Sequence, residues 1–293
     1  MTGAGMNEKI RLPYPHSGQI LVRNEAKRFN WLSAGRRWRK TTLTMAIAVE
    51  SAAKGKTIIW GAPTYDQVRI GFSETIKAAN GVADFNLTRM EAVFPNNGRI
   101  IYRSLDKANN ARGYTADGVV MDEAAYIDKD AWGQVLRPML IDTGGWSWAI
   151  GTPAGRNWYW EEHMKAADDP DSMAWQVPTL GVKITDSGLV REPHAYENPD
   201  ISFEEMQKVF KAMPRQVFEQ EILGQFIDLS GGVFRRVQEA ATLKPQEPQA
   251  GRQYIAGVDV ASSVDYTVVT VMDVETRSMV YMDRFNRVDY PVL

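Results

Sequence analysis

Two adjacent carboxylates, Asp122 and Glu123, end a short apolar run that begins at Val119. Such a run fits a buried parallel strand, and an acid at its carboxyl end lies where open α/β sheets bind ligands. One carboxylate could hold Mg²⁺ while its neighbour orients and deprotonates a water molecule that attacks a phosphate. A surface turn could also contain Asp-Glu, so the interpretation depends on residues elsewhere in the chain.

A basic segment upstream has the composition of a phosphate-binding loop, which needs N–H groups at a helix amino terminus, a lysine for phosphate and a hydroxyl for Mg²⁺. Lys40 and Thr41 supply the last two. Ala34 stands where the strict pattern has its first glycine, and Arg39 where it has its second, which normally permits unusual backbone angles. The alternative is a basic helix start that binds another anion. The predicted nucleotide-binding residues are Gln19, Gly35, Arg36, Arg37, Arg39, Lys40, Thr41 and Thr42.

Three further residues are candidates for contacts with a nucleotide. Gln19 could read an adenine edge with its carboxamide or simply face solvent. Arg112 lies in a polar loop, where it could reach a γ-phosphate in the same or a neighbouring subunit or remain solvated. Thr152 directly follows a predicted strand, so its hydroxyl could sense the γ-phosphate or belong to a simple turn.

The elements that must position these residues alternate between strands and helices. This alternation implies an α/β fold with a doubly wound, mostly parallel sheet. After a polar segment with two prolines at 244–251, three consecutive strands are expected, the last two as an antiparallel hairpin. The predicted strands are 30–33, 57–62, 99–105, 119–122, 147–150, 254–260, 267–273 and 278–285, and the predicted helices are 41–53, 64–79, 157–167 and 202–223, the last capped by Ser202.

The composition, 44% hydrophobic and 24% charged, is that of an ordinary globular protein. We expect no membrane association and no secretion, because no long apolar run or secretory leader is visible. The absence of cysteine excludes disulfides, thiolate zinc sites and cysteine nucleophiles. Residues 1–60 hold 11 Lys and Arg against 3 Asp and Glu, although the net charge is −2. Any contact with DNA must therefore come from a local patch or from an oligomer.

Asp259 lies on the first strand of the C-terminal region. A carboxylate on a central strand is what two-metal nucleases use, but they need two or three acids that converge on the metals. One acid alone is insufficient evidence for such a site. The aromatic segment 158–160 could be a stacking platform for nucleic acid, although packing of a helix in the core is the simpler interpretation.

Taken in order, these motifs resemble the large terminase subunit of tailed bacteriophages. The resemblance covers nearly the whole chain and implies an ATP-driven motor that cuts concatemeric viral DNA and packs it into a procapsid through the portal. The segments that carry the resemblance are Gln19, 34–42, 62–65, 112–113, 120–125, 151–153, 218–226 and 257–261.

The resemblance also implies a role for each matching residue. Lys40 and Thr41 would bind the phosphates of ATP and Mg²⁺. Asp122 and Glu123 would be the Walker B pair, in which Asp122 holds the metal ion and Glu123 is catalytic. Arg39 could weaken ATP affinity, or its side chain could fold outward without effect.

Four other residues match motifs of the family. Gln19 would read adenine, Thr152 would belong to the motif that couples hydrolysis to movement, and Arg112 would be an arginine finger offered to a neighbour in a ring. Asp259 would be the first metal-binding acid of the nuclease.

The expected architecture is an ASCE-type P-loop ATPase domain with a helical lid at 1–225, a linker at 226–252 and the N-terminal part of an RNase H-like nuclease domain at 253–293. The nuclease site would take Mg²⁺ or Mn²⁺. Because the sequence stops before the later acidic residues of such a site, we expect no nuclease activity from this polypeptide alone.

The implied partners are double-stranded DNA, the portal protein, the small terminase subunit and further copies in a homo-oligomeric ring. The implied location is the host cytoplasm, with transient attachment to the procapsid portal. Two alternatives remain open at this stage: a helicase or remodelling ATPase of the same broad class, and a catalytically degenerate prophage remnant.

Overall fold

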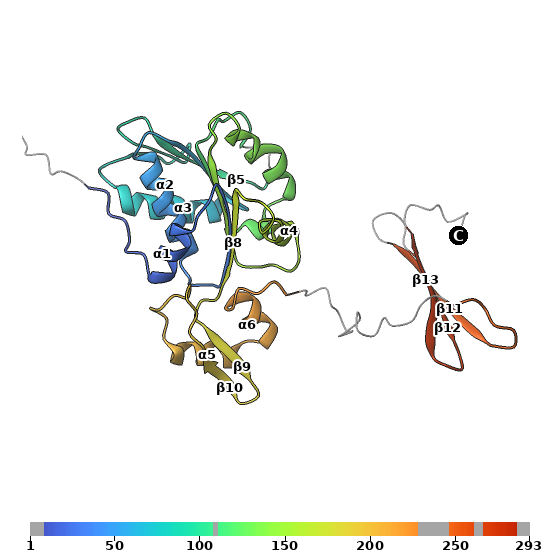
Figure 1. Cartoon of the computed structure of the whole chain (residues 1–293). Coiled ribbons are helices and arrows are strands. Elements are labelled where there is room, and N and C mark those ends of the chain that lie inside the picture. Colours follow the sequence, from blue (N-terminus) through green and yellow to red (C-terminus); the bar gives the residue numbers. More distant parts are fainter. Residues whose placement is uncertain (1–8, 108–110, 228–245, 261–265, 286–293) are drawn as a thin grey trace, which may run out of the picture. The chain divides into compact units, whose positions relative to one another are not determined.

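The structure is a computed structural model that describes residues 9–107, 111–227, 246–260 and 266–285 (Figure 1). The chain divides into two compact units, Met1–Ser230 and Gly231–Leu293. Among the described residues, no helix combines the length and apolar character that crossing a membrane requires.

The first unit is built on an eight-stranded sheet in the order β3-β4-β5-β2-β6-β7-β1-β8. All neighbouring strands pair in parallel except β3 with β4 and β4 with β5. The predicted α/β fold with a mostly parallel sheet is therefore confirmed. The strands are β1 (Phe29–Ala34), β2 (Thr57–Ala62), β3 (Asp84–Asn86), β4 (Glu91–Val93), β5 (Arg99–Ser104), β6 (Gly118–Asp122), β7 (Trp146–Gly151) and β8 (Ser172–Val177).

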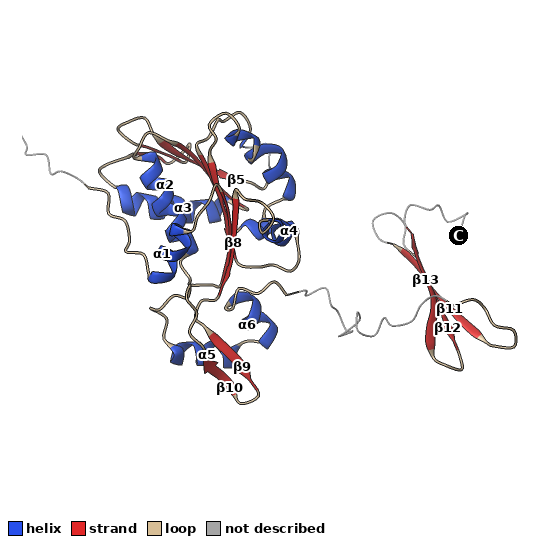
Figure 2. Cartoon of the chain, in the orientation of Figure 1, coloured by secondary structure: helices blue, strands red, loops and turns tan. Residues whose placement is uncertain are grey.

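Helical segments cover both faces of this sheet, as Figure 2 shows. Alternate residues of a strand point to opposite faces, so Ile58 packs with α2 and α3, whereas Ile59 packs with η3, η4 and α4. Each face thus has its own apolar core. The helical segments are α1 (Ser17–Asn24), α2 (Lys40–Ala52), α3 (Tyr65–Ala79), η2 (Ala124–Tyr126), η3 (Ala131–Leu136), η4 (Pro138–Leu140) and α4 (Trp158–Lys165).

A small subdomain, residues 178–224, follows the last strand of this sheet. Its elements are β9 (Val182–Thr185), β10 (Gly188–Arg191), α5 (Phe203–Ala212) and α6 (Arg215–Glu221). These elements enclose a separate apolar core that includes Leu180, Met206 and Phe218. The small subdomain therefore has an apolar core of its own.

The single helix predicted at 202–223 is wrong, because α5 and α6 are separate. Met213 has an extended backbone (φ −135°, ψ 153°), and Pro214 precedes the first turn of α6. Proline disfavours helical angles at the residue before it and lacks an N–H group, so it ends one helix and begins the next. The predicted cap is confirmed, since the Ser202 side chain accepts a hydrogen bond from the Glu205 N–H.

The second unit contains a three-stranded antiparallel sheet in the order β11-β12-β13. Its strands are β11 (Tyr254–Asp259), β12 (Thr267–Asp273) and β13 (Ser278–Phe285), so the predicted antiparallel hairpin is confirmed. Its RNase H-like character stays a prediction. The predicted linker at 226–252 lies largely outside the described residues.

Candidate functional site

The candidate site lies where three parallel strands end at the same edge of the sheet. β7 lies between β1 and β6, and all three are parallel. The segment after β1 is the predicted phosphate loop, Thr152 follows β7, and Asp122 ends β6. This strand order places Thr152 between the phosphate loop and the acidic pair.

Direct contacts join the predicted residues across this edge. The Lys40 Nζ donates to the Thr152 Oγ1 at 3.1 Å and lies 3.5 Å from the Glu123 Oε1. The Thr41 hydroxyl donates towards both carboxylate oxygens of Asp122, at 3.1 and 3.3 Å. Lys40, Asp122 and Thr152 are buried. Residues that are far apart in the sequence therefore form one cluster of opposite charges and hydroxyls.

Burial is the main cause that raises the pKa of Asp122 to about 7, and the neighbouring Glu123 raises it further, against the opposing effects of Lys40 and Thr41. A divalent cation would relieve the cost of two carboxylates in this position. A carboxylate beside a hydroxyl also suits Mg²⁺, which binds through one or two carboxylates together with phosphate oxygens. The side chains of Asp122 and Thr41 thus fit a magnesium ion.

Glu123 has left-handed backbone angles, φ 52° and ψ 47°. Such angles are costly for a residue with a side chain and persist only where the surrounding structure enforces them. Its N–H donates to the Asp122 Oδ1 at 3.1 Å. The strained turn therefore directs the two neighbouring carboxylates to different positions in the site.

The phosphate loop, residues 34–41, alternates between backbone conformations. Arg37 (φ 67°) and Arg39 (φ 69°) are left-handed, whereas Trp38 between them is not. Alternation of this kind turns successive N–H groups towards a common concavity that binds anions. Among the described residues, the N–H groups of Arg37, Arg39, Lys40 and Thr41 have no hydrogen-bond acceptor. The loop thus presents free donors at the amino terminus of α2.

Arg39 occupies a position that demands glycine-like angles, as the strict pattern implies, and its side chain leaves the loop. Its Nη1 lies 2.8 Å from the Asp200 Oδ2, and the two side chains are 46% and 53% exposed. Of the two alternatives raised by the sequence, the outward orientation is the one adopted. The guanidinium therefore does not fill the concavity where the N–H groups are free.

The loop also contacts the small subdomain closely. The Arg36 N–H donates to the Glu221 backbone oxygen at 2.7 Å, and the Arg36 Nε lies 2.6 Å from the Glu221 Oε2. A Cβ atom at Gly35 would lie 2.1 Å from the Ile222 backbone oxygen. Glycine is therefore required here by close backbone approach and not by a positive φ.

Gln19 is 2% exposed, so the alternative of a solvent-facing side chain is wrong. Its Oε1 accepts from the His16 N–H at 3.0 Å, and its Nε2 donates to the Arg39 backbone oxygen at 2.8 Å. The carboxamide thus supports the phosphate loop. A cavity of about 90 Å³ lies beside it, and its lining includes Pro13, Pro15 and Thr42.

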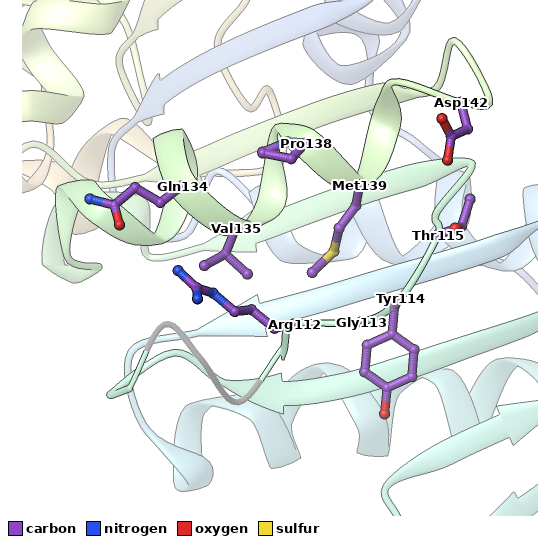
Figure 3. Close-up of a pocket in the computed structure, with 9 residues that line it drawn as sticks. All are labelled: Arg112, Gly113, Tyr114, Thr115, Gln134, Val135, Pro138, Met139 and Asp142. Carbon is purple, nitrogen blue, oxygen red and sulfur yellow. The ribbon is translucent and has the colours of Figure 1, made fainter.

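Arg112 is not brought into this cluster. It is exposed and forms no hydrogen bond or ion pair within the described part of the chain. It lines an open cavity of about 270 Å³ together with Val135 and Met139 (Figure 3). Tyr114 in the same loop is held by the Arg103 Nη2, which donates to its hydroxyl at 2.7 Å. Arg112 is therefore exposed two residues before a tyrosine that Arg103 holds.

Asp259 lies exposed on β11 of the second unit. Within the described ranges, no three His, Cys, Asp or Glu side chains form a group that could hold a metal ion. A metal role for Asp259 stays a prediction. Trp158 and Tyr159 of α4 are buried in the core, so the packing interpretation is confirmed for these two residues, whereas Trp160 is only half-buried.

Several residues around the loop carried no signal in the sequence. Thr179 and Asn198 donate to carbonyls of Arg36 and Arg37, at sequence separations of 143 and 161 residues. Polar residues in an irregular, proline-containing stretch are usually solvated, and nothing in the spacing relates them to the loop. Only the tertiary structure identifies them.

A mostly parallel α/β sheet with free N–H groups at a helix start, a lysine and an acidic strand end is the arrangement expected of a phosphate-binding α/β domain. The chain belongs to the terminase large-subunit family. The family model for the T4likevirus-type large subunit, N-terminal region, matches residues 31–241.

Known relatives agree with this assignment. The chain is 26% identical over 315 residues to the terminase large subunit of Thermus virus P23-45, covering 93% of this chain and 63% of that protein. It therefore spans less than two thirds of that relative's length.

Two solved structures share the fold. The large terminase ATPase domain of Thermus phage P74-26 has a TM-score of 0.54 at 23% identity, covering 73% of this chain and 94% of that one. The large terminase of another thermophilic bacteriophage, in complex with ADP, has a TM-score of 0.55 at 12% identity, covering 92% and 68%.

Proposed function

We propose that this chain binds ATP and Mg²⁺ at the candidate site and hydrolyses ATP as a subunit of a motor that packages viral DNA. The observation that carries the proposal is the cluster of Lys40, Thr41, Asp122, Glu123 and Thr152 at the amino terminus of α2. The ADP complex of the similar terminase from a thermophilic bacteriophage supports nucleotide as the ligand.

The proposed phosphate contacts come from the loop and its lysine. The free N–H groups of the loop would bind the β-phosphate, and Lys40 would contact the β- and γ-phosphates. Lys40 is now held by Thr152 and Glu123. A γ-phosphate would compete with Glu123 for the lysine ammonium and free that carboxylate to act on water.

Thr41 and Asp122 would hold Mg²⁺, which when bound neutralises charge on the phosphate oxygens. Glu123 would orient the attacking water and accept its proton. Thr152 would sense loss of the γ-phosphate through Lys40, since the two side chains are directly bonded. Each proposed role uses an atom that faces the same edge of the sheet.

The remaining site residues have less direct support. Gln19 and Thr42 border the cavity of about 90 Å³, where an adenine ring would contact their polar atoms, and Gln19 would need to release the loop to read its edge. Arg36, Arg37 and Arg39 add positive charge around the phosphates. Arg112 would act on a nucleotide bound by a neighbouring copy, because it has no partner in the described part of its own chain.

Family membership supports the wider proposal. The chain would translocate double-stranded DNA into a procapsid as part of a ring that binds the portal protein and the small terminase subunit in the host cytoplasm. Residues 1–225 would be the ATPase domain with its lid, 226–252 the linker and 253–293 the start of an RNase H-like nuclease, where Asp259 would bind Mg²⁺ or Mn²⁺.

The test is steady-state ATP hydrolysis with Mg²⁺, with and without double-stranded DNA, for the wild type and Glu123→Gln. We expect hydrolysis by the wild type, stimulation by DNA and loss of at least about a hundredfold in the variant, since a general base contributes about 10²–10⁴-fold. Absence of hydrolysis in a folded wild type would favour the degenerate remnant, and ATP-dependent strand separation would favour a helicase.

A mixing experiment tests the role of Arg112. Subunits with Arg112→Ala and subunits with Glu123→Ala should each be inactive and should restore hydrolysis to one another when combined. Failure to complement, with both variants folded and self-associating, would place the arginine's action within its own subunit or remove it from the mechanism.

A further inference from the structure

Side chains hold four consecutive backbone carbonyls of the phosphate loop. The carbonyl oxygens are those of Arg36, Arg37, Trp38 and Arg39. Their donors are, in that order, the Thr179 Oγ1 at 2.6 Å, the Asn198 Nδ2 at 3.0 Å, the His16 Nε2 at 2.9 Å and the Gln19 Nε2 at 2.8 Å. Each carbonyl in this run therefore accepts a hydrogen bond from a side chain.

All four donors belong to buried residues, and they come from two separate parts of the fold. His16 and Gln19 lie at the start of α1, where they also cap each other's backbone N–H groups. Thr179 and Asn198 lie in the small subdomain and are 1% and 0% exposed. The loop is thus hydrogen-bonded by α1 on one side and by the small subdomain on the other.

The direction of a carbonyl fixes the direction of the adjoining N–H group. In a planar trans peptide the C=O and N–H bonds point in opposite directions. Carbonyls held outward therefore turn the N–H groups of Arg37, Trp38, Arg39 and Lys40 away from the side chains that hold them. Three of these groups, those of Arg37, Arg39 and Lys40, are without an acceptor among the described residues.

The same contacts explain how arginine occupies positions that suit glycine. Left-handed angles at Arg37 and Arg39 persist only if the surroundings determine the conformation of the loop. The Asn198 Oδ1 also accepts from the Asp200 N–H at 3.1 Å, and the Asp200 side chain pairs with Arg39. Asn198 is therefore connected to both left-handed residues.

We propose that Thr179 and Asn198 are positioning residues of the phosphate site, which together with His16 and Gln19 form a carbonyl clamp that holds the loop ready for phosphate before any ligand binds. The proposal rests on the proposed nucleotide site. It makes the conformation of the phosphate loop depend on the small subdomain, because two of the four donors belong to that subdomain.

Thr179→Val tests the clamp most simply, since valine has the shape of threonine but cannot donate to the Arg36 carbonyl. Thr179→Ser keeps the hydroxyl and should behave as the wild type. Thr75→Val is the matched control, because Thr75 is also fully buried and bonds through its hydroxyl, in this case to Tyr102 on β5 and not to the loop.

Variants at a second position keep the proposal testable if Thr179→Val fails to fold. Asn198→Asp replaces the donor to the Arg37 carbonyl by an acceptor of the same size. Asn30→Asp is its control, since the buried Asn30 Nδ2 donates to the Lys27 and Ser147 carbonyls near the other end of β1. All these variants are measured at about pH 8.5, so that the carboxyl groups introduced in Asn198→Asp and Asn30→Asp are less able to donate a proton to a backbone carbonyl.

The first readout is hydrogen exchange of the Arg36 and Trp38 amides in the nucleotide-free chain, because these two N–H groups of the loop are hydrogen-bonded, to the Glu221 and Gly35 carbonyls. We expect exchange at least about tenfold faster in Thr179→Val and Asn198→Asp than in the wild type, with no change in Thr179→Ser, Thr75→Val or Asn30→Asp. Unchanged exchange in both clamp variants would overturn the proposal. This result does not depend on whether the chain binds ATP.

The second readout is the affinity for ATPγS with Mg²⁺, measured by calorimetry. We expect about tenfold weaker binding in each clamp variant and wild-type affinity in the controls, equivalent to about 1.4 kcal/mol. Equal weakening in the matched controls would mean a general loss of packing and would overturn the proposal. A wild type that binds no nucleotide would refute the proposed function, and the exchange data would still decide whether the clamp orders the loop.

Discussion

Replacing Arg39 with glycine should leave the first unit almost as stable as the wild type. Arg39 is left-handed (φ 69°, ψ 37°), a conformation that costs a residue with a Cβ atom about 1–2 kcal/mol. Glycine removes that cost. It forfeits the exposed pair with Asp200, worth about 0.2–1 kcal/mol, and adds about 0.5–1 kcal/mol of chain entropy to the unfolded state.

These opposing effects nearly cancel, so Arg39→Gly should lie within about 1 kcal/mol of the wild type. Arg39→Ala loses the same ion pair but keeps the left-handed strain, so it should be about 1 kcal/mol less stable than Arg39→Gly. Arg69 on α3 is the matched control, because it is exposed and its φ is not positive. There the order should reverse, with alanine about 1 kcal/mol more stable than glycine.

Guanidinium unfolding followed by tryptophan fluorescence measures these differences. All nine tryptophans lie between Trp31 and Trp175, so the signal reports the first unit alone. The reasoning would be refuted if alanine were as stable as glycine at position 39 while the control at position 69 behaved as expected. That outcome would mean that the left-handed conformation carries no measurable cost.

Three further predictions concern the site and its surroundings. Gly35→Ala should destabilise by more than about 2 kcal/mol, because its Cβ would overlap a backbone oxygen at 2.1 Å, whereas Gly133→Ala, with no atom within 4 Å, should be neutral or slightly stabilising in thermal unfolding. Burial lowers the pKa of His163 to about 4, so folding favours its neutral form. The free energy of unfolding should therefore be highest above pH 6.5 and fall as the pH is lowered towards 4. This fall should be up to about 3 kcal/mol larger in the wild type than in His163→Gln. Because the pKa of Asp122 is raised to about 7, Asp122→Asn should raise stability at pH 8 by about 1 kcal/mol or more while weakening Mg²⁺-dependent nucleotide binding, and a less stable variant would contradict this.

Five strands of the central sheet, β1, β2, β5, β6 and β7, were predictable because they are short apolar runs that end at polar turns. The order along the chain also indicated which polar residues would meet, since parallel strands end at a common edge. Lys40, Thr41, Asp122, Glu123 and Thr152 do meet there. The position of β7 between β1 and β6 carried no sequence signal, although it explains why Lys40 contacts a hydroxyl after β7.

Other features were missed for identifiable reasons. β3 and β4 have three residues each, too few for a period-two pattern to be recognised. Pro214 did mark the break between α5 and α6, and the helical periodicity on either side concealed it. The contacts of Gln19 could not be predicted, because its partners are backbone groups that only the folded chain brings near.

The residues that bond the carbonyls of the phosphate loop could not be predicted from the sequence either. Thr179 and Asn198 bind carbonyl groups, which every residue has, so no pairing of side-chain types points to them. Arg39 departed from the strict pattern of a phosphate loop, because it stands where the pattern has a glycine. The left-handed angles of Arg37 and Arg39 are explained only by contacts from elsewhere in the fold.

The most direct test of the nucleotide site is equilibrium binding of ATPγS with and without Mg²⁺ to the wild type, Lys40→Ala and Lys56→Ala. Lys56 is the control, because its ammonium pairs with Asp117 at the opposite edge of the sheet. We predict Mg²⁺-dependent binding that is lost in Lys40→Ala and kept in Lys56→Ala. A wild type that binds no nucleotide, or a Lys40→Ala variant that binds it as tightly as the wild type, would contradict the assignment of this site.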